Sequence, residues 1–500
     1  MELGQLAGQV DGARLIGDPK TSILGIEYDS RLVKPGSAFV ALRGGYTDGH
    51  AFADQAAAAG AAALVVEEQL PIAIPQVIVP ATRRDLATLA ASFYGHPSEA
   101  LSVIGVTGTD GKTTTSYLID HILRDSGITT GMVGTVSVRI GTETVDHETR
   151  QTTPESADIQ RLLRQMVDAS VQVAILEATS HGLDLHRLDH VRFEIGVVTN
   201  ITYEHLEHHK TVERYWRAKA ILFERVAAAG GIAVVNLDDE GARSMLRYTH
   251  NCARVLTYSQ FDESADLVAR VYTSDLTGST GTVRWDGREI PMRLPLVGDF
   301  NVSNALAALA TAIGAGIDVQ AATASLATVS GIPGRMVNVE AGQPFGVVVD
   351  YAHTPESLAK VLRLLRRLRP TGRLIAVFGS AGERDTTKRP IQGSIAAELA
   401  DVVVVTNEDP RFEAAETIID QIVAGAVLAG AVPGRTVFAI TERREAITRA
   451  FQLAAQGDTV LLAGKGHERS IIWNGVKHLW DEQRVALELL ADLGWTEAQV

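Results

Sequence analysis

Short runs of apolar, largely β-branched residues recur along this 500-residue chain from Leu101 onward, and stretches of helical length separate them. Uninterrupted apolar runs are typical of strands buried on both faces of a parallel sheet. Their alternation with helices predicts βαβ units and an α/β fold. The runs span residues 102–106, 173–178, 195–199, 232–236, 346–350, 373–378, 401–406, 436–440 and 459–464.

The chain is too long for one hydrophobic core, so it should divide into several domains. Breaks are expected near GHPSEA (95–100) and GIPGR (331–335), which gives domains of residues 1–98, 99–333 and 334–500. Within the second domain the segment 253–297 reads as antiparallel strands, with Asp286-Gly287 as a hairpin turn. In residues 1–98 we expect short strands and one Ala-rich helix within 51–66 that runs into a strand.

The charge of the chain limits its possible partners, and its cysteine content indicates its compartment. The formal net charge of −14 argues against nucleic acid or a membrane surface, both of which favour basic patches. The single cysteine, Cys252, excludes an internal disulfide framework and is typical of a reducing compartment. No signal peptide is recognisable, so we expect a cytoplasmic protein.

The segment GVTGTDGKTTT (105–115) follows one apolar run and opens a helix. Glycines let backbone N–H groups turn toward an anion, and a helix N-terminus adds partial positive charge. The segment therefore predicts a nucleotide phosphate loop, although Val106 stands where the standard motif has its first glycine. Lys112 would reach the β- and γ-phosphates of ATP, and Thr113 would hold Mg²⁺. The ATP-binding residues of this loop would be Gly108, Thr109, Asp110, Gly111, Lys112, Thr113 and Thr114.

Two further groups suggest metal chemistry. Glu177 ends an apolar run, where a carboxylate is costly unless it is paired or bound to a metal; both readings stay open. After the next run come Glu204, His205, His208 and His209, and then Lys219 among apolar neighbours. A buried lysine has a lowered pKa and becomes reactive, for example toward CO₂.

In the last third of the chain, polar clusters follow the apolar runs one after another. Ligands bind at the carboxyl ends of strands in open α/β sheets, so these clusters predict a second binding rim. Its candidate members are Asp350, His353, Arg384, Lys388, Arg389, Arg411, Lys465, His467 and Glu468.

Taken in order, GTDGKTTT, EATSHG, the His-rich segment with its downstream lysine, DYAHTP, DPR and GKGHE resemble the Mur ligase family, across essentially the whole chain. YDSR (28–31) and RGGYTDGH (43–50) resemble the branch that adds the third residue of the stem peptide. The resemblance implies a UDP-sugar-binding domain, a central P-loop ATPase domain and a C-terminal Rossmann-like domain. It further implies ATP- and Mg²⁺-dependent ligation of a diamino acid to the D-glutamate side chain of UDP-N-acetylmuramoyl-L-alanyl-D-glutamate, through an acyl phosphate.

The resemblance also assigns residues. Lys112, Glu177, His205 and Lys219 would be catalytic, with Thr113, Glu177, His205 and a carbamate on Lys219 as metal ligands. Further nucleotide contacts would be Asn301, Asn304, Arg335 and Asp350. UDP-sugar-peptide contacts would be Tyr28, Ser30, Gly45, Tyr46, Thr47, Thr152, Thr153, Thr179 and Arg187. The amino-acid pocket would comprise Arg384, Glu408, Asp409, Pro410, Arg411, Gly464 and Glu468.

The identity of the added amino acid stays open. Arg384 and Arg411 favour a substrate with two carboxylates, meso-2,6-diaminopimelate, because a guanidinium pairs with a carboxylate through a fork. Asp409 replaces the family's asparagine and suits a free ammonium, as in L-lysine or L-ornithine.

Two alternatives compete with this interpretation. A folylpolyglutamate-synthetase-like ligase would share the loop and lysine but lack the N-terminal domain. A non-catalytic nucleotide-binding regulatory paralogue would have lost catalytic positions, whereas all four are present. The expected partners are small molecules, namely ATP, the UDP-linked dipeptide and the diamino acid. We expect the protein to be a monomer.

Overall fold

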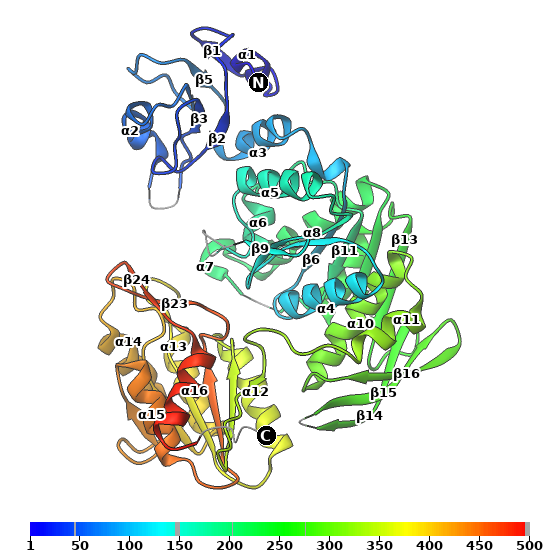
Figure 1. The fold of residues 1–500 in the computed structure, drawn as a ribbon, viewed down its shortest axis with the longest axis vertical. Helices are drawn as coiled ribbons and strands as arrows, with labels where there is room; N and C mark the ends of the chain where they lie inside the picture. The colour runs from blue at the N-terminus through cyan, green and yellow to red at the C-terminus, as the bar shows by residue number, and fades with distance from the viewer. Residues whose placement is uncertain (45–46, 146–150, 203, 276, 496–500) are drawn as a thin grey trace. The chain divides into compact units, whose positions relative to one another are not determined.

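The computed structural model describes residues 1–44, 47–145, 151–202, 204–275 and 277–495 (Figure 1). The chain forms two compact units. The first comprises Met1–Arg270, Gly281–Met292 and Val302–Ala327, and the second Val271–Thr280, Arg293–Asn301 and Thr328–Val500.

The N-terminal part of the first unit holds a five-stranded sheet of order β1-β5-β4-β3-β2. Strands β2 to β5 are parallel and β1 is antiparallel to β5. The strands are β1 (Arg14–Ile16), β2 (Gly25–Glu27), β3 (Ser37–Val40), β4 (Ala63–Val66) and β5 (Gln76–Ile78); the helices are α1 (Leu3–Ala7), α2 (Ala53–Ala58) and α3 (Thr82–Phe93). The Ala-rich stretch is thus a helix followed by a strand, as predicted.

The central sheet has eleven strands in the order β16-β15-β14-β13-β12-β11-β6-β10-β7-β8-β9. Its middle, from β7 to β14, is parallel throughout. The strands are β6 (Ser102–Thr107), β7 (Thr130–Val133), β8 (Val138–Ile140), β9 (Glu143–Val145), β10 (Val173–Glu177), β11 (Ile195–Val198), β12 (Ile232–Asn236), β13 (Arg254–Ser259), β14 (Leu267–Asp275), β15 (Gly278–Trp285) and β16 (Arg288–Leu294).

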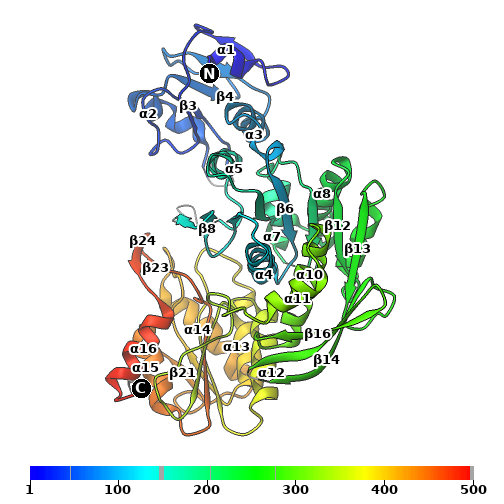
Figure 2. The same cartoon turned by 45° about the vertical axis from the view of Figure 1, so that its right-hand side comes forward.

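Helices cover both faces of this sheet. On one face, alternate strand residues such as Val103 and Leu176 share a core with Leu163 and Phe223 of the helices α5 and α8. On the other face Gly314 of α10 packs against strands β11 to β13. Figure 2 shows α3 beside α5, two helices that are in contact. The helices are α4 (Lys112–Asp125), α5 (Ser156–Asp168), α6 (Ser180–Asp184), α7 (Leu206–His209), α8 (Val212–Ala228), α9 (Glu240–Arg243), α10 (Asp299–Gly314) and α11 (Val319–Leu326).

The segment 253–297 was expected to be antiparallel, and this is only partly right. Strand β13 pairs in parallel with both β12 and β14, so it extends the parallel sheet. Strands β15 and β16 are neighbours joined by Asp286 and Gly287, with φ of 48° and 73°, the backbone of a type I′ hairpin turn. The local apolar pattern of β13 did not reveal its partner strands.

The second unit contains a six-stranded sheet of order β17-β18-β22-β19-β20-β21, parallel except for β17. Successive residues of each strand point to opposite faces of the sheet and belong to two separate cores. One core is lined by α15 and α16 and the other by α12 and α14, which is the doubly wound arrangement. The strands are β17 (Val337–Asn338), β18 (Gly346–Asp350), β19 (Leu374–Phe378), β20 (Val402–Val405), β21 (Val437–Ala439) and β22 (Thr459–Ala463), with a separate pair β23 (Ser470–Trp473) and β24 (Val476–Leu479). The helices are α12 (Pro355–Leu368), α13 (Lys388–Leu399), α14 (Ala415–Leu428), α15 (Arg443–Leu453) and α16 (Glu482–Asp492).

Every apolar run named from the sequence forms a strand within one or two residues of its expected ends, and the α/β prediction is confirmed. Among the described residues, no helix combines the length and the apolar character needed to cross a membrane.

Candidate active site

The phosphate loop lies between the end of β6 and the start of α4, where two glycines have left-handed backbone. Gly108 has φ of 154°, and a Cβ there would lie 1.9 Å from Thr199 Oγ1. Gly111 has φ of 85°, and a Cβ there would lie 2.3 Å from Asn304 Oδ1. A side chain at either position would have to displace its neighbour, so glycine lets the loop present its backbone. The N-terminus of α4 that follows is suited to an anion.

Neighbouring residues hold the loop in this shape. Asn200 accepts from the Asp110 N–H at 3.0 Å and donates to the Asp110 carbonyl at 3.1 Å. Thr109 Oγ1 lies 2.9 Å from the Tyr215 hydroxyl, and Thr114 is buried at the start of α4. Sequence reasoning missed Asn200 and Tyr215 because each acts through a contact distant in the chain.

Two lysines meet at the loop. Lys112 Nζ donates to the carbonyls of Gly108 and Thr109 at 3.0 and 2.8 Å, and Lys219 Nζ donates to Gly108 O at 2.7 Å. Lys219 is only 1% exposed, and its amine lies 4.7 Å from the centre of the Tyr215 ring. Burial and then the charge of Lys112 hold the pKa of Lys219 well below its usual value. Lys219 is therefore disposed to be a neutral amine.

Glu177, at the end of β10, is 1% exposed and surrounded by oxygen and nitrogen donors. Its Oε2 accepts from the hydroxyls of Thr113 at 3.1 Å and Thr135 at 2.9 Å, and its Oε1 accepts from the Thr135 N–H at 3.0 Å. A carboxylate grouped with hydroxyls beside a phosphate loop is a donor set suited to Mg²⁺. Thr135 was missed, because nothing in the sequence around it signals a contact with Glu177.

His205 belongs to a cluster of four histidines. The ring of His181 lies 4.6, 4.4 and 5.5 Å from the rings of His205, His208 and His209. Burial and then the neighbouring imidazoles lower the pKa of His181 to about 3, and burial and then His208 lower that of His209 to about 4. The His209 ring lies 5.4 Å from Tyr215, which touches Lys219, so the cluster adjoins the loop.

The residues assigned to the muramoyl-peptide gather around Glu177. Thr153 Oγ1 donates to the Glu177 carbonyl at 2.7 Å and lies 2.9 Å from Thr179 Oγ1. Thr152 Oγ1 lies 3.0 Å from Thr135 Oγ1. Arg187 donates to the Thr153 carbonyl at 3.0 Å. These four residues, from the 152–153 segment and from either side of α6, therefore gather around the end of β10 that carries Glu177.

The residues assigned to the UDP end are more dispersed. The Tyr28 hydroxyl donates to Asp158 of α5 at 2.6 Å, whereas the Ser30 hydroxyl donates to Gln55 at 3.1 Å. Thr47 is exposed, with its carbonyl accepting from Gly44 N–H at 2.8 Å. Gly45 and Tyr46 lie outside the described residues.

Three of the residues assigned to the nucleotide belong to the second unit, whereas Asn304 lies at the loop. The Arg335 guanidinium lies 4.8 Å from the centre of the Tyr351 ring. Asp350 accepts from the backbone N–H groups of Met336 at 2.9 Å and Ala352 at 2.8 Å. Asn301 donates to Val297 O at 2.8 Å. All these contacts are with other residues of the protein, so the nucleotide role of the three residues stays a prediction.

The assigned amino-acid pocket centres on a buried lysine. Lys465, with no exposed surface, donates to Asp409 Oδ1 at 3.1 Å and also to Glu468 Oε2. Asp409 Oδ1 therefore already accepts from Lys465, which is shared with Glu468, and from the Ile472 N–H at 2.8 Å. This finding weakens the expectation that Asp409 serves a substrate ammonium.

The rest of this pocket brings Glu408, Gly464 and Pro410 together with Arg411. A Cβ on Gly464 would lie 2.6 Å from Glu408 Oε2, an oxygen with no hydrogen-bond partner among the described residues. Burial raises the pKa of Glu408. Pro410 is buried and Arg411 half-buried, and the latter's Nε also lacks a partner within the described part of the chain. Arg384 is exposed on the loop after β19.

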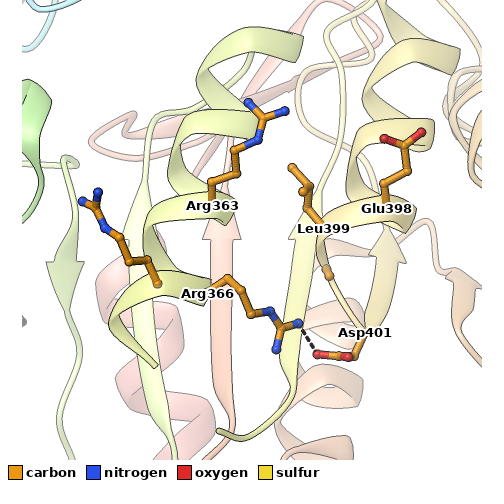
Figure 3. Close-up of a pocket in the computed structure, with 7 residues that line it drawn as sticks. Arg363, Arg366, Glu398, Leu399 and Asp401 are labelled. Carbon is orange, nitrogen blue, oxygen red and sulfur yellow. Dashed lines mark hydrogen bonds and ion pairs between the residues drawn. The ribbon is translucent and has the colours of Figure 1, made fainter. Parts of the chain in front are cut away.

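A separate hollow lies at the amino ends of the strands of the six-stranded sheet (Figure 3). It is lined by Arg363 and Arg366 of α12 and by Glu398 to Asp401, which directly precede β20. Arg366 pairs with Asp401 across it. Ligands of α/β sheets bind at the carboxyl ends of the strands, so this hollow is distinct from the candidate amino-acid pocket.

Comparison with protein families gives three matches along the chain. Residues 22–94 match the Mur ligase family catalytic domain, 106–312 the Mur ligase middle domain, and 334–466 the Mur ligase glutamate ligase domain.

Individual proteins are similar over nearly the full length. A UDP-N-acetylmuramyl-tripeptide synthetase of Roseiflexus sp. is 47% identical over 95% of each chain. A UDP-N-acetylmuramoyl-L-alanyl-D-glutamate–2,6-diaminopimelate ligase of Bacillus cereus is 38% identical over 98% of each. A solved structure of an enzyme with the latter name is 32% identical, covers 99% of both chains and superposes with a TM-score of 0.66.

Proposed function

The chain belongs to the Mur ligase family of ATP-dependent amide-bond-forming ligases, and on that premise we propose that it adds a diamino acid to UDP-N-acetylmuramoyl-L-alanyl-D-glutamate in peptidoglycan synthesis. The observation that carries the proposal is the convergence of Lys112, Lys219 and Glu177 on one phosphate loop. The cationic loop would grip the nucleotide, and the buried carboxylate beside it would complete an oxygen-rich site.

The proposed reaction has two steps. A side-chain carboxylate oxygen of D-glutamate attacks the γ-phosphorus of ATP, forming an O–P bond as the bond to the leaving ADP oxygen breaks. The amine of the incoming amino acid then attacks the acyl carbon, and phosphate leaves with the electron pair of the C–O bond. Lys112 and the N-terminal N–H groups of α4 would stabilise charge on the phosphoryl oxygens. The convergence of Thr152, Thr153, Thr179 and Arg187 near Glu177 supports placing the acceptor peptide there.

Mg²⁺ is the proposed cofactor alongside ATP. Thr113 and Glu177 would hold a first ion, His205 would be a ligand of a second, and Lys219 as a carbamate would be a further metal ligand. When bound, the ions would neutralise phosphate charge. Lys219 is suited to carbamate formation, because a neutral amine can attack the carbon of CO₂ and release a proton to solvent. The product would place at this buried position the anion that a metal ligand set requires.

We propose meso-diaminopimelate as the added amino acid, with L-lysine or L-ornithine as the alternative. The Lys465–Asp409 pair supports this order, because Lys465 and the Ile472 N–H already occupy Asp409 Oδ1 and make it less available to a distal ammonium. The half-buried Arg411, whose Nε lacks a partner among the residues described, suits a second carboxylate.

The domain division 1–98, 99–333 and 334–500 is part of this proposal, as are a monomeric state and a cytoplasmic location. A folylpolyglutamate-synthetase-like role is disfavoured by the family match at residues 22–94. A non-catalytic role is disfavoured because Lys112, Glu177, His205 and Lys219 are all retained.

The deciding experiment is phosphate release from ATP by the purified protein. We expect release only when UDP-N-acetylmuramoyl-L-alanyl-D-glutamate and a diamino acid are both present, with diaminopimelate, lysine and ornithine tested in parallel. Absence of release with all three would leave the regulatory alternative standing.

A further inference from the structure

The histidine cluster contains a group of side chains that the proposed ligase reaction does not use. Asp184 ends helix α6, and His208 and His209 end helix α7. The His208 Nε2 and Asp184 Oδ2 atoms lie 2.7 Å apart. One ligand atom from each of the three side chains lies within 4.8 Å of the other two.

We propose that Asp184, His208 and His209 form a binding site for a divalent transition-metal ion of the Zn²⁺ class. Two imidazoles and one carboxylate are a donor set that such ions prefer, whereas Mg²⁺ prefers oxygen ligands. The proposed set shares no member with the oxygen-rich set at Glu177 and Thr113. The proposed magnesium ligands His205 and Lys219 are not members of it either, although His205 belongs to the same histidine cluster. Zinc binding can be measured without the ligase reaction.

A second observation supports a ligand at this place. His209 is 3% exposed, and its Nε2 is buried without a hydrogen-bond partner in the described part of the chain. A buried polar atom left unpaired destabilises a protein, so it calls for an explanation. A metal ion bound by this group of side chains would supply one.

The geometry permits an ion with little movement. Ligand bonds of about 2.0–2.2 Å place donor atoms roughly 3–4 Å apart around one ion. The His208 Nε2 and Asp184 Oδ2 atoms, now 2.7 Å apart, would have to separate slightly, and these side chains are 29% and 44% exposed, so they have room to adjust around an ion. The exposed side leaves space for water as a remaining ligand. An ion there would cross-link α6 to α7.

The test is direct metal binding to the full-length protein stripped of metal. We would titrate Zn²⁺ calorimetrically in excess Mg²⁺, and use Co²⁺ as a visible spectroscopic probe of imidazole coordination. We expect one Zn²⁺ per chain, with affinity reduced more than about tenfold in His208→Gln and in Asp184→Asn, since even losing an outer-sphere partner costs about 10–100-fold. Zn²⁺ should also raise the melting temperature of the wild type but not of His208→Gln.

His250→Gln is the matched control, because His250 is an exposed histidine of the same unit away from the cluster. It should bind Zn²⁺ as the wild type does. The proposal would be overturned by no saturable binding, by equal binding in His208→Gln and wild type, or by loss of binding in His205→Gln with retention in His208→Gln. The last result would place the ion with the proposed catalytic residues. Circular dichroism of each variant separates loss of a ligand from loss of the fold.

Discussion

Lys112 and Lys219 donate to the same oxygen, the carbonyl of Gly108, at 3.0 and 2.7 Å. Two ammonium groups sharing one acceptor repel each other, and Lys219 is the one without solvent. Burial first, and Lys112 second, lower the pKa of Lys219. The contact thus favours the uncharged amine at Lys219, which is the form that the carbamate hypothesis requires.

The first prediction concerns Lys219. Lys219→Ala should lower kcat by at least about 10²–10³-fold, the scale of losing a group that organises transition-state charge. Added acetate or formate should restore part of the activity by replacing the missing carboxylate, and removal of CO₂ should slow the wild type. Phosphate release measures each case.

Arg217→Ala is the matched control, since Arg217 lies on the same helix but is exposed and pairs with Glu224. It should retain near wild-type activity. Full activity in Lys219→Ala would contradict the carbamate hypothesis.

Much of the fold could be predicted because buried parallel strands leave a direct mark on the sequence. Runs such as 102–106 and 459–464 are apolar after their first residue, since both faces of the strand are covered, and the structure places β6 and β22 there. The phosphate loop was equally visible, because glycine, lysine and threonine are each required by a local constraint.

The remaining details depend on contacts between distant residues. Strand β13 looks like any short strand, and only its neighbours β12 and β14 make it parallel. Thr135 reaches Glu177 across 42 positions, and Lys465 reaches Asp409 across 56. Neither pairing leaves a periodic signal, so the contact of Lys465 with Asp409 could not be read from the sequence.

The second prediction separates steric fit from backbone strain in the phosphate loop. Gly111→Ala should weaken ADP binding by at least about tenfold, because its Cβ would lie 2.3 Å from Asn304 Oδ1 and displace the loop. Gly127→Ala is the control. Its φ of 81° is close to the 85° of Gly111, but nothing lies within 4 Å of an added Cβ. Both variants bear the cost of a left-handed alanine, about 1–2 kcal/mol.

Calorimetric ADP titration and thermal melting distinguish the two effects. Gly127→Ala should lose stability but bind ADP normally. Equal ADP affinity in Gly111→Ala and Gly127→Ala would show that Gly111 is needed only for its backbone angle.

The third prediction tests the amino-acid pocket. Arg411→Ala should raise the KM for meso-diaminopimelate about 10–100-fold, since a hydrogen bond to a charged group contributes about 1.5–3 kcal/mol. The KM for L-lysine, which lacks the second carboxylate, should change far less. Arg435→Ala, an exposed arginine on another loop of the same unit, serves as control. An unchanged KM for diaminopimelate in Arg411→Ala would refute the assignment.

The last prediction uses the buried carboxyl of Glu408, whose pKa is raised chiefly by burial, against the opposing charges of Lys388 and Lys465. Because the folded protein holds this proton more tightly than the unfolded chain, stability is lost as pH rises from about 4.5 through the folded pKa. Glu408→Gln cannot ionise, so its melting temperature should rise relative to that of the wild type over this pH range. The difference should persist at neutral pH. A difference of 1 kcal/mol corresponds to about 2–4 °C in a unit of this size.

Melting curves from pH 4 to 8 provide the measurement, with the exposed Glu398→Gln as control. A melting-temperature difference between Glu408→Gln and wild type that stays constant across this range would show that Glu408 does not titrate there, and that its burial is matched by the neighbouring lysines.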